Sequence, residues 1–192
     1  MKIEDTPLSP LESLTLISDA IRKTKDNFKE NSSYFMLWGW LIAVASFAFF
    51  VLQQYTAFKY YFLPFPVLVV TGIVVTLSWY VKRRSANQTE TYSGYFFSRM
   101  WLVLGLGFIA VVFVSVSQKV PPFQYTLIIA AIGTMVSGLA MKFKPLVIGG
   151  VLFFAAAIIG LYIPDAYKPL LAGAAIVAGY LIPGYLLKSA KI

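Results

Sequence analysis

Ionisable side chains in the middle of a membrane span are the usual carriers of chemistry in a bilayer, and this sequence has almost none. Its 192 residues include no histidine and no cysteine, and six of its eight acidic residues precede residue 31. A Ser–His dyad needs histidine, and metal sites need histidine, cysteine or clustered carboxylates. We therefore expect a protein that is not an enzyme and that holds no metal or cofactor. Proton- or sodium-coupled transport, which relies on buried carboxylates, is also disfavoured.

Arg99 is the one ionisable residue placed within an apolar stretch, in SGYFFSRMW. It falls near one end of that stretch, where a long side chain can extend to the membrane interface. We expect Arg99 to anchor the topology. The alternative is an ion pair with Asp26, Glu30 or Glu90 that ties the N-terminal segment to the helices.

That N-terminal segment has the pattern of an amphipathic helix. The stretch SPLE matches a capping box, with Ser9 as N-cap and Pro10 in the first turn. An apolar stripe follows at spacings of three, four and seven, with Thr24 in the remaining position; its members are Leu14, Ile17, Ile21 and Phe28. Charged residues occupy the opposite face, and the stretch NSS at residues 31–33 predicts a bend or helix junction.

This arm, defined as residues 1–32, has two interpretations. It can lie on the cytoplasmic leaflet, where lysine and arginine meet anionic headgroups. It can instead pack its stripe on protein: a second copy in a homo-oligomer, a cytoplasmic or membrane protein partner, or the ends of this chain's own spans. The five basic and six acidic residues of the arm nearly balance. This balance disfavours electrostatic adhesion to lipid and favours packing on protein.

Long apolar helices carry the remaining residues. The chain is 59% hydrophobic and 12% charged, against about 25% charged in soluble domains. Apolar runs of about 18 residues or more are long enough to cross a bilayer. We predict an all-α membrane protein in which a cytoplasmic amphipathic helix precedes six transmembrane helices, arranged as three hairpins over residues 33–188, with 189–192 as a cytoplasmic tail. The predicted spans are Tyr34–Leu52, Leu63–Val81, Tyr95–Val116, Tyr125–Met141, Pro145–Tyr162 and Pro169–Leu187.

Lysine and arginine determine the predicted orientation. Six spans place both termini on one side, and 13 of the 16 basic residues fall on that side, leaving Lys59, Lys119 and Lys168 on the other. Both termini are therefore expected in the cytoplasm. The net charge of +8 follows from this topology and from headgroup contact, so we expect the lipid bilayer, and no nucleic acid, as a partner.

Aromatic and small residues divide between the two halves of the predicted bundle. The first three spans are rich in aromatic residues, and the tryptophans near the cytoplasmic interface form an aromatic belt; they are Trp38, Trp40, Trp79 and Trp101. The last three spans carry small residues four positions apart, which allows close helix packing; the pairs are Gly133/Ser137, Thr134/Gly138, Ala156/Gly160 and Ala175/Gly179. Packing within the chain explains these pairs, and homo-oligomerisation through one face is the alternative. An aromatic pocket for an apolar or cationic ligand is a further alternative for the first half.

Prolines mark the beginnings of several predicted spans, where a first helical turn tolerates them. Pro183 is different because it falls inside the last span, between Gly179 and Gly184. It predicts a kink or a loosened turn near the end of that helix.

Three stretches, TKDNFKENSSYFMLWGWL, SGLAMKFKPLVIGG and GYLIPGYLLK, resemble a family of small bacterial integral membrane proteins with six spans and no assigned activity. The resemblance covers most of the chain. It implies a multi-pass protein of the bacterial inner (cytoplasmic) membrane and transfers no function.

Two functional hypotheses follow. The first is a non-enzymatic inner-membrane protein that regulates or scaffolds through its cytoplasmic arm. The second is a transporter or channel for an uncharged or apolar small solute, with the aromatic half as a pocket and the Pro183 region as a moving part.

Overall fold

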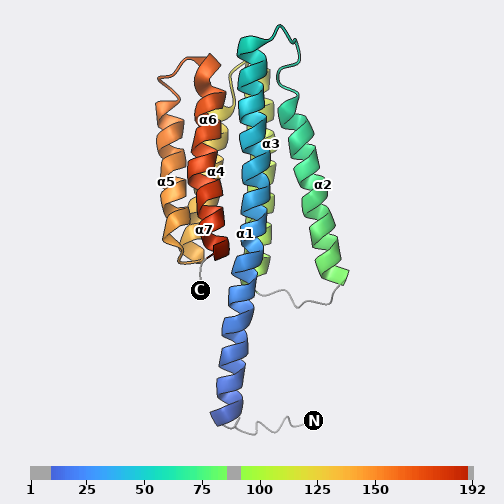
Figure 1. The fold of residues 1–192 in the computed structure, drawn as a ribbon, viewed down its shortest axis with the longest axis vertical. Helices are drawn as coiled ribbons and strands as arrows, with labels where there is room; N and C mark the ends of the chain where they lie inside the picture. Colours follow the sequence, from blue (N-terminus) through green and yellow to red (C-terminus); the bar gives the residue numbers. More distant parts are fainter. Residues whose placement is uncertain (1–9, 86–91, 190–192) are drawn as a thin grey trace.

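The computed structural model describes residues 10–85 and 92–189; for 10–31 (Thr15 excepted), 83–85 and 92–93 we consider the backbone only. Helices joined by turns make up the described residues, and no strand occurs among them. In chain order the helices are α1 (Pro10–Tyr55), α2 (Pro64–Ser85), α3 (Tyr92–Ser117), α4 (Phe123–Ala140), α5 (Lys144–Ile159), the 3₁₀ turn η1 (Asp165–Tyr167), α6 (Lys168–Ile176), the π-helical segment η2 (Val177–Leu181) and α7 (Ile182–Ser189). Figure 1 shows them as side-by-side rods, with α6, η2 and α7 forming one rod.

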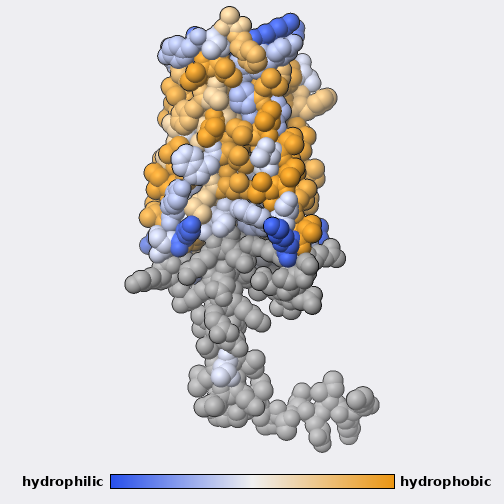
Figure 2. Space-filling view, turned by 45° about the vertical axis from the view of Figure 1, so that its right-hand side comes forward, coloured by the Kyte–Doolittle hydropathy of each residue, from blue (hydrophilic) through white to orange (hydrophobic). Residues whose placement is uncertain are grey.

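Five stretches are long and apolar enough to cross a membrane: Ser32–Tyr55, Pro64–Lys82, Gly94–Ser117, Phe123–Ala140 and Asp165–Ser189. Figure 2 shows an apolar band over one face of the bundle, with hydrophilic residues at both ends. The fifth predicted span corresponds to α5, which has only 16 residues. At 1.5 Å per residue α5 is about 24 Å long, which is shorter than a hydrocarbon core of about 30 Å.

Prolines begin several of these helices, as the sequence predicts. Pro64 is the first residue of α2, and Pro145 and Pro169 lie in the first turns of α5 and α6. Proline has no amide hydrogen to donate, and the first turn of a helix has no carbonyl to receive one. The helix starts are therefore encoded locally.

The ends of α3 and α4 use a motif that the sequence analysis did not predict. Lys142 adopts a left-handed conformation with φ of 53°. The amide of Phe143 then donates to the carbonyl of Gly138 at 2.8 Å, and the amide of Lys142 donates to Leu139 at 3.1 Å. This is a Schellman ending, in which glycine is the usual left-handed residue. Lys119 ends α3 with φ of 59°, and at α4 the motif reverses the chain so that α5 returns along α4.

The helices of the bundle differ in how closely they pack against one another. The pair α4 and α5 is the most closely associated, and α1 packs against α2, α6, η2 and α7. In the spanning stretch of α4, 44% of residues are buried, against 6% in that of α2 and 6% in that of α3. Each of the three expected hairpins has contacts between its helices. The sequence grouped α1 with the aromatic half, but α1 also packs against the small-residue helix formed by α6, η2 and α7.

The helix α1 is unbroken over 46 residues. The bend or helix junction predicted at Asn31–Ser33 is therefore wrong, because the backbone stays helical through all three residues. Asn and Ser cost less than about 1 kcal/mol each inside a helix, and Ser32 is completely buried, so packing overrides the local signal. In Figure 1 the first part of α1 continues beyond the ends of the other helices as a straight extension.

Candidate functional site

A groove of about 410 Å³ opens between α1, α2 and α7, at the end of the bundle where α7 finishes. The residues that define its character are Leu37, Trp40 and Leu41 of α1, Trp79 of α2, and Tyr185 and Lys188 of α7. Among the described residues its walls are mostly apolar and aromatic, and Lys188 is the one charged side chain in the described lining. This combination suits an amphipathic ligand better than a reaction centre.

Two tryptophans are oriented by hydrogen bonds across helices. The indole nitrogen of Trp40 donates to the Tyr185 hydroxyl at 3.0 Å, and that of Trp38 donates to the Thr76 hydroxyl at 3.2 Å. The first bond connects α1 to α7 and the second connects α1 to α2. Trp79 packs edge-on against Tyr34 of α1, with ring centroids 5.5 Å apart.

Trp101 is partly buried, and its ring packs against aromatic side chains of other helices. It packs against Phe35 at 6.1 Å and against Tyr180 at 6.2 Å between ring centroids, and Tyr180 also meets Phe153 at 6.2 Å. A side chain at Gly133 would collide with the Trp101 ring, 2.9 Å away. Trp101 therefore packs α3 on α4, and its place in the interfacial belt stays a prediction.

Arg99 is exposed, and its guanidinium lies over the ring of Tyr95, 5.1 Å from the centroid. Such a cation–π contact keeps a long side chain along its own helix. The side chains of Asp26 and Glu30, its predicted partners, lie outside the described residues, as does Glu90. The ion pair between the arm and the bundle therefore stays a prediction, as does the stripe of Leu14, Ile17, Ile21 and Phe28, of which only the helical backbone is described.

Pro183 follows the π-helical segment η2 almost directly. Proline donates no hydrogen bond to the carbonyl four residues earlier, which is that of Gly179. That carbonyl oxygen is so close to Gly149 of α5 that a methyl group on Gly149 would overlap it. A methyl group on Gly179 would in turn come within 2.8 Å of the Gly149 carbonyl oxygen. The widened turn thus lets two glycine backbones meet directly.

The small-residue pairs named from the sequence are all buried within the chain. A side chain at Gly138 would collide with the backbone of α5, because the Val147 nitrogen is 2.6 Å away. Ser137 and Thr134 are completely buried, and their hydroxyls have no hydrogen-bond partner among the described residues. These pairs therefore serve helix contacts inside one copy.

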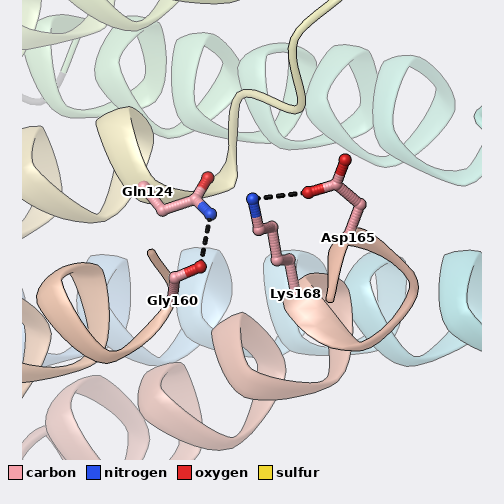
Figure 3. Close-up of polar contacts among 4 residues, drawn as sticks. All are labelled: Gln124, Gly160, Asp165 and Lys168. Atoms are coloured by element: carbon pink, nitrogen blue, oxygen red, sulfur yellow. Dashed lines mark hydrogen bonds and ion pairs between the residues drawn. The ribbon is translucent and has the colours of Figure 1, made fainter. Parts of the chain in front are cut away.

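The connection between α5 and α6 lies at the opposite end of the bundle from the end of α7 (Figure 1). Figure 3 shows two polar contacts there. The buried side-chain amide of Gln124 donates to the carbonyl of Gly160 at 2.8 Å, which ties the start of α4 to the end of α5. Lys168 pairs with Asp165 at 2.5 Å across the first turn of the last rod. Both contacts fix helix ends, and the described residues hold no cluster of three or more metal-ligating side chains.

Several residues of the site escaped the sequence analysis. The sequence analysis placed Tyr185 in the last span and Lys188 at its basic end, and gave neither a role in a binding site. The groove forms because α1 and α7 lie side by side, which the order of helices in the sequence does not predict. Gly149 belongs to no small pair at four-residue spacing, since position 153 is Phe. The GG dipeptide at 149–150 was the available signal for a close backbone approach.

Comparisons with known protein families, with curated proteins and with solved structures found no match for this chain. The resemblance to a bacterial six-span family therefore stays a prediction, and the functional argument rests on the chain itself.

Proposed function

We propose that this chain is a six-span integral membrane protein of the bacterial inner membrane, with both termini in the cytoplasm. In this proposal it works without catalysis, as a scaffold or regulator. Its cytoplasmic arm docks another α-helix, which belongs to a second copy or to a partner protein.

The six-span topology has two supports. The described N- and C-terminal ends lie at the same end of the bundle (Figure 1). The helix ends that carry Lys82, Lys142, Lys144 and Lys188 lie there too, as the positive-inside rule requires of a cytoplasmic end. The weak point is the length of α5. Because α5 lies along α4 and the last rod, a short helix there is surrounded on those sides by protein, which reduces its mismatch with the bilayer.

The observation that carries the functional proposal is the unbroken helix α1. About 20 residues suffice to span the hydrocarbon core, and the apolar stretch of α1 begins only at Ser32. Residues 10–31 thus extend about 33 Å beyond the span at 1.5 Å per residue. A helix that continues straight out of the bundle is directed away from the membrane, so the membrane-surface interpretation of the arm loses support.

The spacing of the stripe indicates what the arm binds. Leu14, Ile17, Ile21, Thr24 and Phe28 alternate steps of three and four residues, which is the repeat of a coiled-coil seam. Isolated helices of this length are marginal in water and gain most of their stability from packing an apolar face. A second helix lying along this seam supplies that packing.

The test is native mass spectrometry of the full-length protein, extracted gently from its own membranes, beside two single variants. Ile21→Asn places a polar residue in the stripe, and Lys23→Asn introduces the same residue on the charged face. We expect a discrete added mass, either one chain or one partner, that is present in the wild type and in Lys23→Asn and absent in Ile21→Asn. A bare monomer in all three samples would contradict the proposal.

The competing transport hypothesis makes a different prediction. If the π-helical segment is a moving part, Pro183→Ala should abolish solute flux in liposomes while leaving the added mass in place. In our account Pro183 serves the Gly149–Gly179 contact, so Pro183→Ala lowers the stability of the protein. Liposomes that contain the wild type or this variant should then be no more permeable to an uncharged solute than protein-free liposomes.

A further inference from the structure

The groove beside Trp40 is open and follows one face of α1. Its floor is α1, and α2 and α7 both pack on α1 and form its sides. The lining runs along α1 from Ser33 to Leu41, a rise of about 12 Å. Its volume of about 410 Å³ falls in the range of small-molecule sites, about 300–1,000 Å³. It is therefore long enough for part of one acyl chain.

The chemistry of the groove changes along its length. Lys188 lies at the end where α7 finishes, one residue from the last described position, whereas Leu37 and Leu41 line the part deeper in the span. Trp40 lies between Leu37 and Leu41 along α1, and its hydrogen bond joins it to Tyr185, which precedes Lys188 by three residues on α7. A cation at the end of the bundle, followed by aromatic and apolar side chains further into the span, matches the change from headgroup to acyl chain in a phospholipid.

Charge selects among phospholipids. Lys188 is exposed, and no acidic side chain lines the groove in the part of the chain whose side chains the structure describes. Lys82 is also exposed and follows Trp79 by three residues on α2, the helix that lies across the groove from α7. Basic pockets between spanning helices on the cytoplasmic side bind anionic headgroups, whereas a zwitterionic headgroup would bring its own cation toward these lysines.

We propose that the groove between α1, α2 and α7 binds one anionic phospholipid of the adjoining leaflet. An acyl chain lies along Leu37 and Leu41, and the phosphate pairs with Lys188. This binding site is independent of the arm, so it holds whether or not the arm docks a helix.

Affinity is tested by native mass spectrometry of the full-length protein in mild detergent, after delipidation, with phosphatidylglycerol or phosphatidylcholine of matched chains added back. The protein should bind phosphatidylglycerol more tightly than phosphatidylcholine. Removing one lysine near a headgroup corresponds to about a fivefold loss of affinity, which we expect for Lys188→Gln. Lys144→Gln removes an exposed charge outside the groove and should leave the affinity unchanged.

Location is tested by tryptophan fluorescence with phosphatidylglycerol brominated on its acyl chains. The brominated lipid should quench the wild type more than brominated phosphatidylcholine does. This excess should disappear in the double variant Trp40→Phe/Trp79→Phe and persist in Trp101→Phe, whose ring is outside the groove. Equal binding of the two lipids, equal losses in the two lysine variants, a second protein chain in place of lipid, or an excess that survives the double variant would each overturn the proposal.

Discussion

The helices α4 and α5 meet through their backbones, whereas α2 and α3 touch the bundle through the ends of large side chains. A side chain added at Gly150 of α5 would strike the Met135 Cβ at 2.6 Å and the Ala131 carbonyl oxygen at 3.0 Å. A side chain added at Gly72 of α2 would meet only the tips of Leu41 and Trp38. Backbone cannot move aside as a side-chain tip can. The α4–α5 contact is therefore rigid, and the periphery can adjust, as a lipid groove along α2 requires.

The largest difference between the two regions should come from removing a phenylalanine. Phe153 of α5 is 1% exposed and Phe113 of α3 is 71% exposed. Phe153→Ala leaves a cavity in the core and should lower the free energy of unfolding by about 4 kcal/mol. Phe113→Ala removes a side chain that faces lipid or detergent both before and after unfolding, so its effect should stay within about 0.5 kcal/mol. Reversible unfolding in mixed micelles measures both, and equal losses would contradict the division into a rigid core and an adjustable periphery.

A smaller but more specific difference should come from adding a methyl group. Gly149→Ala forces the Gly179 carbonyl away and should destabilise the protein by about 3 kcal/mol, as overpacking does. Gly72→Ala displaces only side-chain tips and gains helix propensity, so we expect a net change below about 1 kcal/mol. Gly105 has no atom within 4 Å of an added side chain, and Gly105→Ala gives the propensity gain alone. If Gly149→Ala behaves like Gly105→Ala, the backbone contact between α5 and η2 is not present.

The smallest effects should be the same in both regions. Lys119 ends α3 and Lys142 ends α4, both with positive φ, and glycine adopts this conformation without the penalty of about 1 kcal/mol that other residues carry. Lys119→Gly and Lys142→Gly should each raise the free energy of unfolding by about that amount. Similar gains would show that the two regions differ in packing and share their local turn chemistry. A gain at one position and a loss at the other would show that one lysine side chain has a stabilising contact.

The sequence predicted where the helices lie better than how they associate. Apolar runs and prolines located every helix of the bundle, because both signals act locally. The left-handed endings were missed because lysine stands at positions 119 and 142, where glycine is the usual signal. The bend at Asn31–Ser33 was predicted wrongly because the burial of Ser32 depends on neighbours far along the chain.

The candidate site was less predictable for the same reason. The groove depends on α7 lying beside α1, and Tyr185 and Trp40 are 145 residues apart. Nothing in the local pattern around GYLIPGYLLK indicates its partner. The contacts of Trp101 also depend on tertiary structure, because the sequence does not show whether a tryptophan ring faces other helices or the surroundings of the bundle.

The central claim is that α1 is one straight helix whose arm leaves the membrane, and a single distance tests it. The chain has no cysteine, so spin labels at Thr15→Cys and Val51→Cys need no background substitutions; both positions are exposed. In lipid nanodiscs, electron–electron double resonance should give a separation of about 54 Å for an unbroken helix. A separation of about 38 Å, the value for a right-angle bend at Ser32, would place the arm on the membrane surface and contradict the account.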